Sequence, residues 1–362
     1  MELLVQKFLR NGGTLETLNA QYGIKARRHT RHPELVSLKY NQIESPMGER
    51  IVQECRGIIL NSEDNWGVVA RPFDKFFNHG EGHAAPLDWN TARVQEKVDG
   101  SLMILYFYKG EWQIASSGTP DASGEVNGHG FTFENLFWKI WKETGLALPL
   151  EPNKTFMFEM CSMYNRVVVR HLTSFLVLIG VRDRNTGLET QVDAYNKVYP
   201  VVKSFPLNNL EGILASFATI DPMSQEGFVV VDSKGDRQKM KHPGYVAIHH
   251  MAGGMTPKQF LEVVRAGESA EFLVHFPEYA EGYNDVKDRF DGLVAELDEA
   301  YSSIEHLESQ KDFALEAIKT RFSAALFQRR KSGVSVRKVL SETSITGLMK
   351  TLGLRDVVKE AE

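Results

Sequence analysis

The sequence predicts an α+β protein in which a domain of antiparallel sheets is followed by an all-helical domain. Up to about residue 250, short runs of β-branched and aromatic residues alternate with links of Gly, Asn and Asp, which is typical of hairpins. After about residue 254, apolar residues recur every three or four positions, as on one face of a helix. With 362 residues, 42% of them hydrophobic, the chain can bury two cores, so we expect domains at residues 1–250 and 251–362.

In the first domain, periodicity predicts helices near residues 2–10 and 133–144, the second with its apolar residues on one face. The predicted strands are carried by the runs "LMILYFY" and "WQIAS" (102–108 and 112–116), "TFMFEM" (155–160), "RVVVRH" (166–171), "SFLVLIGVRD" and "LETQV" (174–183 and 188–192), and "GFVVVD" and "RQKMK" (227–232 and 237–241). Several of these runs are joined by turn residues, so the sheets are expected to be antiparallel and not doubly wound.

In the second domain, a helix is expected to begin at Pro257 with Thr256 as its N-cap and to stop near Gly267. A long amphipathic helix is then expected over residues 286–307, where apolar residues alternate at spacings of four and three. We expect it to fold back on one partner helix around residues 313–330.

Composition excludes several classes of protein. No apolar run approaches 18 residues, and Glu2, Gln6 and Lys7 interrupt the N-terminus, so we expect a soluble, cytoplasmic (intracellular) protein without membrane contact. Separately, we expect a monomer. Two cysteines are too few for a disulfide framework or a cysteine-based zinc site, and no histidine pair has the further ligands that close a metal site. No Gly-Lys-Ser/Thr occurs, which excludes a P-loop, and "GEGHAA" is a poor dinucleotide fingerprint.

Charge is segregated along the chain. The net charge of −5 argues against indiscriminate nucleic-acid binding, yet residues 25–32 ("KARRHTRH") contain no acid, and residues 319–338 contain seven Lys or Arg and no acid. Such stretches are solvated faces or local tracks for a polyanion. If the first stretch binds RNA, replacing Arg27, Arg28 and Arg31 is expected to flatten the salt dependence of binding.

Charged residues also stand where the β-rich pattern predicts apolar ones. Each alone is explained by a surface position or a structural ion pair. Together, cations with two carboxylates on half-buried hairpins suit a polyphosphate and its divalent metal. Neighbouring cations would favour the neutral, nucleophilic amine of the lysine in "EKVDGSLM". The residues are Arg56, Lys75, Lys97, Glu159, Glu226, Lys239 and Lys241.

These residues occur in a recognisable order. "KVDG" (97–100), "FEM" with Glu159, "VLIGVRD" (177–183), "EGFVV" (226–230) and "KMK" (239–241) resemble motifs I, III, IIIa, IV and V of the covalent nucleotidyltransferases, which include DNA ligases, RNA ligases and mRNA capping enzymes. "CRGIIL", "RPFDKFFNHGE" and "YNRVVV" resemble the ATP-dependent RNA ligase 1 group typified by T-even phages. The likeness runs from about Arg56 to Tyr245.

The resemblance implies an RNA ligase that uses ATP and Mg²⁺ or Mn²⁺. Lys97 would form a lysyl-AMP, and RNA ends bearing a 5′-phosphate and a 3′-hydroxyl, such as those of broken tRNA, would be sealed. By similarity, Arg56 and Lys75 would contact phosphates, Lys239 and Lys241 would hold the α-phosphate, and Gly100 would allow the nucleotide to approach. Glu159 would bind ribose or metal, and Glu226 would bind metal.

Two departures from the family pattern stand out. Ser117 lies where close relatives often have a lysine, and Ile179 and Val181 occupy a run in which several ligases stack adenine on an aromatic residue, which suggests an aliphatic floor for the base. The helical second domain argues against the OB-fold expected of DNA ligases and capping enzymes. In that domain, Arg329, Arg330 and Lys331 are candidate RNA contacts, although a purely structural cap is an equal alternative.

Three alternatives stay open. A capping-type guanylyltransferase would label with GTP instead of ATP. A catalytically inactive nucleotide- or RNA-binding protein would be expected to lack a motif lysine, and none is missing. A ligase of the fungal and plant tRNA type would require a 2′-phosphate at the junction, whereas we expect sealing without it.

Overall fold

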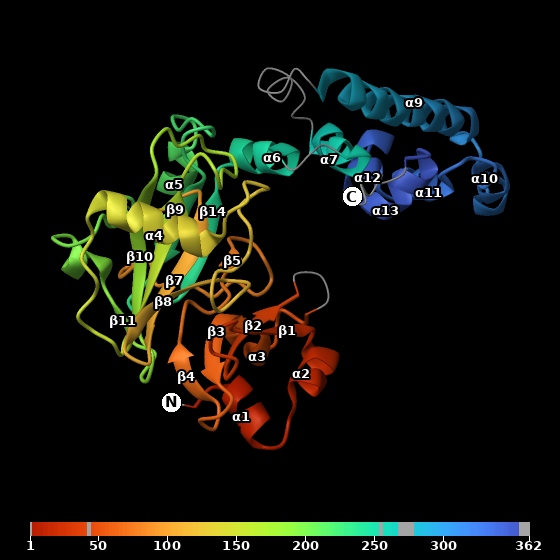
Figure 1. Ribbon diagram of the computed structural model, residues 1–362. Helices are drawn as coiled ribbons and strands as arrows, with labels where there is room; N and C mark the ends of the chain where they lie inside the picture. Colours follow the sequence, from red (N-terminus) through yellow and green to blue (C-terminus); the bar gives the residue numbers. More distant parts are fainter. Residues whose placement is uncertain (1, 42–44, 253–255, 267–278, 355–362) are drawn as a thin grey trace. The chain divides into compact units, whose positions relative to one another are not determined.

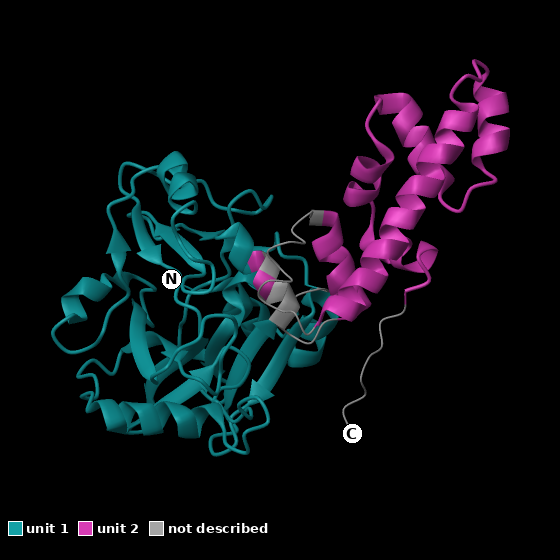
Figure 2. Ribbon diagram, turned by 90° about the horizontal axis from the view of Figure 1, so that it is seen from above, with its two compact units in different colours: residues 1–245 teal, residues 246–362 magenta. Residues whose placement is uncertain are grey.

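The computed structural model describes residues 2–41, 45–252, 256–266 and 279–354 (Figure 1). The chain divides into two compact units, residues 1–245 and 246–362, which are coloured separately in Figure 2. The first unit is built on β-sheets and the described part of the second is helical, as the predicted α+β class requires.

Three sheets form the first unit. The N-terminal sheet has the order β1-β2-β3-β4, with strands Ile24–Arg28, Leu35–Tyr40, Arg56–Asn61 and Gly67–Ala70. The central sheet has the order β11-β10-β9-β7-β8, with strands Glu189–Thr190, Phe175–Asp183, Lys154–Cys161, Ser101–Tyr108 and Glu111–Ser116. The third sheet has the order β12-β6-β13-β14-β5, with strands Ser204–Phe205, Arg93–Glu96, Gly227–Val231, Arg237–Lys241 and Phe77–Asn78. Among these pairings only β14 with β5 is parallel.

Helices and sheets stack in layers because the faces of the sheets carry buried apolar side chains that pack against a helix or another sheet. Helices α1 to α3 (Leu4–Arg10, Leu15–Tyr22 and Arg50–Glu54) cover one face of the N-terminal sheet. The opposite face of that sheet packs on β7 and β8 of the central sheet. Helix α4 (Phe133–Thr144) covers the far face of the central sheet (Figure 1), and α5 (Leu210–Ser216) covers the third sheet.

Most of the predicted strands are present. The β7–β8 hairpin turns at Lys109 and Gly110, whose φ angles of 48° and 88° are those of a tight turn with left-handed residues. The strand predicted for "RVVVRH" is wrong, since residues 166–171 form bends and no strand. The backbone N–H groups of Val168 and Val169 donate to Asp99 Oδ2 at 2.9 and 2.6 Å, and not to a neighbouring strand.

The described helices of the second unit are α6 to α7 (Pro243–Ala252 and Pro257–Ala266), α9 (Ala280–Ile304) and α10 to α13 (Gln310–Ala317, Ser323–Ser332, Val336–Glu342 and Ile345–Thr351). Helix α6 begins at the end of the first unit. The N-cap prediction for α7 is supported, because Thr256 Oγ1 accepts from the backbone N–H of Gln259 at 3.4 Å. Gly267 lies outside the described residues.

The long amphipathic helix is confirmed as α9, which packs its apolar side into the core of this unit. The single partner helix expected near 313–330 is wrong in detail, because that segment is split into α10 and α11. The split falls between Ala317 and Ser323, where α10 ends and Thr320 donates from its hydroxyl back to Ala317 O at 2.8 Å. Within the described part of the chain, no helix is long and apolar enough to cross a membrane.

Candidate functional site

A cavity of about 160 Å³ is bounded by the central and third sheets of the first unit. Along β14, Arg237, Lys239 and Lys241 all line it, because residues two apart in a strand share one face. Across from them, the central sheet contributes Leu102, Glu159 and Ile179. Five of the seven charged residues singled out in the sequence therefore meet in one cavity: Arg56, Lys97, Glu159, Lys239 and Lys241.

Lys97 follows strand β6, and its backbone N–H donates to Gly227 O at 2.9 Å, which ties it to β13. Its Nζ forms an ion pair with Oε2 of the buried Glu226. The other oxygen of Glu226, Oε1, lies 2.9 Å from Lys241 Nζ. One buried carboxylate thus bridges the candidate nucleophile and a second lysine.

The surroundings of Lys97 differ from those expected from the sequence. We expected neighbouring cations at its amine, but its ion-pair partner is the carboxylate of Glu226. For Lys97 to attack a phosphorus atom, Glu226 has to release the amine or share its charge with another cation.

Lys239 is the lysine of this cavity that carries a lowered pKa. Burial and the nearby cations Lys75, Arg56, Lys97 and Lys241 lower the pKa of Lys239 to about 7. Its Nζ lies 5.3 Å from the centroid of the Phe76 ring. A phosphate placed beside Lys239 would restore its charge, since an opposite charge favours the ammonium form.

Glu159 is shifted in the opposite direction. Burial raises the pKa of Glu159 to about 8; Lys97 lowers this pKa and Glu226 raises it. Near neutral pH this carboxyl group is therefore largely protonated without a ligand. It can donate to a hydroxyl group in that form, or release its proton when a metal ion arrives.

Arg56 supplies the clearest sign of an anionic ligand. Burial is the main cause that lowers the pKa of Arg56, and its Nη1 is buried without a hydrogen-bond partner among the described residues. Its guanidinium group lies 5.1 Å from the centroid of the Phe76 ring. A buried donor without a partner is costly, and a phosphate oxygen would satisfy it.

The turn after Lys97 is held by Asp99, whose role the sequence did not reveal. Besides its bonds from Val168 and Val169, Asp99 accepts from the Tyr245 hydroxyl at 2.8 Å through Oδ1. Its backbone oxygen lies 2.8 Å from His171 Nε2. Asp99 thus fixes the "KVDG" turn to the irregular segment around 166–171, which explains why that segment is not a strand.

Asn165 and Gly100 complete this support. Asn165 Nδ2 donates to Ser101 Oγ at 2.9 Å and to Met160 O at 2.7 Å. A Cβ atom on Gly100 would lie 2.5 Å from Met160 O, so only glycine lets the turn approach β9. The structure thus gives a packing reason for Gly100, while its expected role in admitting a nucleotide stays a prediction.

A second cavity of about 450 Å³ adjoins the first and shares five lining residues with it: Phe73, Phe76, Gln95, Ile179 and Arg237. Lys75 lines this larger cavity and not the smaller one. Arg237, which the sequence did not single out, forms an ion pair with Glu189 and lies 4.3 Å from the centroid of the Phe73 ring. The sequence predicts the strand that contains Arg237. Nothing in the sequence distinguishes this arginine from a charged residue on the protein surface.

The remaining predicted residues have other surroundings. Ile179 lines the smaller cavity, but Val181 is buried in the core beneath α4, so only Ile179 is available as a floor for a base. In the second unit, Arg329 forms an ion pair with Asp298, and Arg330 donates to Glu308 O at 2.9 Å. Lys331 is exposed.

The residues present fit a divalent cation held together with phosphates. The part of the chain that the structure describes contains no group of three or more His, Cys, Asp or Glu that could hold a metal. Glu96 and Glu159 line the cavity, and Glu226 lies beside it, in contact with Lys97. Magnesium is commonly bound by one or two carboxylates, with phosphate oxygens and water completing its coordination.

Comparisons with known proteins show the family to which the chain is similar. A family model described as RNA ligase matches residues 54–245. An RNA ligase of Rhodothermus phage RM378 is 27% identical, over 82% of this chain and 86% of its own. A protein of Autographa californica nuclear polyhedrosis virus, named as a bifunctional polynucleotide kinase/RNA ligase, is 29% identical over 76% of this chain and 42% of its own. An archaeal ATP-dependent RNA ligase of solved structure is 14% identical, with a TM-score of 0.44 over 94% of this chain and 81% of that one.

Proposed function

The chain belongs to the RNA ligase family, of the type found in T-even phages as RNA ligase 1, and from that premise we propose that it seals RNA through a lysyl-AMP on Lys97. The observation that carries the proposal is the cavity in which Lys97, the unpartnered Arg56 Nη1 and the lysines of β14 meet. This arrangement suits a nucleotide whose α-phosphate lies at Lys97.

The proposed reaction has three steps. Lys97 Nζ loses a proton and attacks the α-phosphorus of ATP, so that a nitrogen–phosphorus bond forms and the bond to pyrophosphate breaks. The AMP then passes to the 5′-phosphate of an RNA end, which releases Lys97. Finally, a 3′-hydroxyl attacks that phosphate, a phosphodiester bond forms, and AMP leaves.

Each side chain has a proposed role that follows from its position at the two cavities. Lys239 and Lys241 hold the α-phosphate, Arg56 satisfies a phosphate oxygen through Nη1, and Lys75 contacts phosphates from the larger cavity. Such phosphoryl transfers depend mainly on positioning and on neutralising charge, which these cations supply.

Glu226 and Glu159 would hold Mg²⁺ or Mn²⁺, which neutralises phosphate charge. Engagement of Glu226 by a cation would weaken its pairing with Lys97 and so free the amine. Glu159 is equally suited to a ribose hydroxyl while it keeps its proton. These two roles stay alternatives for Glu159.

We assign the transfer chemistry to the sheet-rich domain, residues 1–250, and a supporting or RNA-binding role to the helical domain, residues 251–362. All the residues proposed for catalysis lie between Arg56 and Lys241. The natural substrate is proposed to be RNA broken to leave a 5′-phosphate and a 3′-hydroxyl, tRNA included. Arg329 and Arg330 would have to leave their partners in the second unit to contact it.

A sealing assay with defined ends tests the proposal. A nicked RNA hairpin with a 5′-phosphate and a 3′-hydroxyl is incubated with Mg²⁺ and either ATP or GTP, beside hairpins that have a 5′-hydroxyl or an added 2′-phosphate. We expect sealing with ATP of the first hairpin, loss of sealing in Lys97→Ala, and normal sealing in Lys197→Ala, which removes an exposed lysine of the same unit.

Other outcomes identify the alternatives. Dependence on GTP would favour a guanylyltransferase, and sealing only of the hairpin with the 2′-phosphate would overturn the proposed end specificity. Binding of RNA without sealing under any of these conditions would favour the inactive binding protein.

A further inference from the structure

Four basic residues form a row across the N-terminal sheet. Lys25 of β1 is directly opposite Lys39 of β2. Lys39 pairs with Arg56 of β3 at a register shift between Leu38 and Lys39, and the two side chains are close enough for the charge of Arg56 to act on Lys39. Side chains of directly opposed residues lie on the same face of a sheet. Arg27, two residues from Lys25 along β1, shares that face. The other face of β1 carries Ile24, which packs under the helices of this layer.

The row is costly without a ligand. Like charges directly opposite one another destabilise a sheet. Among the described residues, no ion pair compensates Lys25, Arg27 or Lys39, and the side-chain hydrogen bond of Lys39 goes to Ser117 Oγ at 3.2 Å. Burial and Arg56 lower the pKa of Lys39, which shows how poorly its charge is accommodated.

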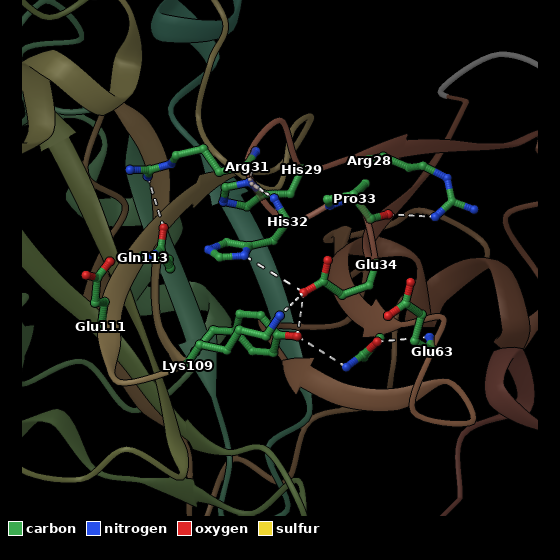
Figure 3. Close-up of polar contacts among 12 residues, drawn as sticks. Arg28, His29, Arg31, His32, Pro33, Glu34, Glu63, Lys109, Glu111 and Gln113 are labelled. Atoms are coloured by element: carbon green, nitrogen blue, oxygen red, sulfur yellow. Dashed lines mark hydrogen bonds and ion pairs between the residues drawn. The ribbon is translucent and has the colours of Figure 1, made fainter.

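The neighbouring arginines of the same basic stretch are engaged elsewhere, as Figure 3 shows. Arg28 donates to Pro33 O at 2.6 Å, and Arg31 donates to Gln113 at 3.1 Å. Arg31 also pairs with Glu134 at 2.9 Å. The structure therefore divides the run "KARRHTRH", which the sequence presented as one basic patch. All four residues are exposed, but Arg28 and Arg31 are engaged by neighbouring groups of the first unit, whereas no ion pair among the described residues engages Lys25 or Arg27.

The row begins at the candidate site, because Arg56 lines its cavity. Neighbouring strands are about 4.8 Å apart, so Lys25 lies roughly 10 Å from Arg56 across the sheet. ATP has only three phosphates, and in the proposed reaction its α-phosphate lies at Lys97. An RNA strand carries a phosphate at each nucleotide and can continue outward along the whole row.

We propose that Arg56, Lys39, Lys25 and Arg27 form a track for the phosphate backbone of the RNA strand whose end is processed at Lys97. This inference rests on the proposed function and deepens it, since it assigns the path by which the substrate leaves the cavity. Because the chain is acidic overall, such a local track is what allows it to bind a polyanion.

The test compares two double variants of the full chain. Lys25→Gln with Arg27→Gln removes the exposed end of the row. Lys139→Gln with Lys142→Gln removes two exposed charges from α4 and serves as the matched control. For each, the dissociation constant for a 5′-phosphorylated single-stranded RNA is measured from 50 to 200 mM KCl, and binding of ATP is measured separately.

We expect the row variant to lower the slope of log Kd against log salt by about 1.4, that is, about 0.7 for each lost contact to a single strand. Its Kd would then change about sevenfold less than that of wild type over this salt range, while the control keeps the wild-type slope. Equal slopes in the two variants would overturn the track. Weakened ATP binding in the row variant with an unchanged RNA slope would also overturn it, because the row would then serve the polyphosphate.

Failure of the RNA track and failure of the proposed function give different results. If wild type formed no lysyl-AMP, the proposed chemistry would fail. A slope lowered only in the row variant would still support the track.

Discussion

Two ionisable side chains of the candidate site carry pKa shifts in opposite directions. Burial lowers the pKa of Lys239 to about 7 and raises that of Glu159 to about 8. Both shifts disfavour a charge in a site that has no ligand. A phosphate beside Lys239 and a cation beside Glu159 would reverse them, so the site is arranged to gain charge when it binds.

Lys239 predicts a pH dependence of nucleotide binding. Without ligand it loses its proton as the pH rises through about 7, whereas bound phosphate favours the protonated form. The affinity for a non-hydrolysable ATP analogue should therefore fall between pH 7 and 9, by up to tenfold for each unit.

Lys239→Arg, which keeps its charge across this range, should flatten the profile that is measured by calorimetry. Lys239→Met should bind more weakly at pH 7 and show little further loss at higher pH. If the three proteins had parallel pH profiles, the shift assigned to Lys239 would be wrong.

At the scale of elements, the structure explains what the sequence could and could not predict. Hairpins such as β7–β8 and β13–β14 carry local signals, namely alternating apolar residues and turn residues, and were predicted correctly. The run at 166–171 has the composition of a strand, yet its backbone bonds to the side chain of Asp99. Such a contact joins segments that are far apart in sequence, so composition cannot reveal it.

The support of the "KVDG" turn by Asp99 predicts a loss of both stability and activity in Asp99→Asn. An amide keeps the shape but replaces an acceptor by a donor, which opposes either the Tyr245 hydroxyl or the N–H groups of Val168 and Val169. Hydrogen bonds to a charged group contribute about 1.5–3 kcal/mol, so unfolding by urea should show a loss of about 2 kcal/mol.

We also expect Asp99→Asn to slow formation of the lysyl-AMP at saturating ATP, because Lys97 is displaced. Asn153→Ala, which removes a polar contact with Asp183 at the far end of β10, is the control and should leave this rate unchanged. Unaltered stability and rate in Asp99→Asn would show that the turn is held by its packing alone.

In the molecule as a whole, the candidate site residues could be predicted from the sequence because their motifs lie on a few strands. Arg56, Lys97, Glu159, Lys239 and Lys241 were predicted to act together and line one cavity. The row across β1, β2 and β3 was not predictable in this way, since cross-strand pairing depends on register, and register is set by the whole sheet. For the same reason the sequence grouped Arg27 with Arg28 and Arg31, whose contacts differ.

The proposed attachment of AMP to Lys97 can be detected by intact-protein mass spectrometry. Wild type and Lys97→Ala are first washed with pyrophosphate to remove any bound AMP and are then incubated with Mg²⁺ and ATP. We expect wild type to gain the mass of one AMP that survives denaturation, pyrophosphate to remove it, and Lys97→Ala to gain nothing. An unmodified wild-type chain, or an equal gain of mass in Lys97→Ala, would show that Lys97 does not carry AMP.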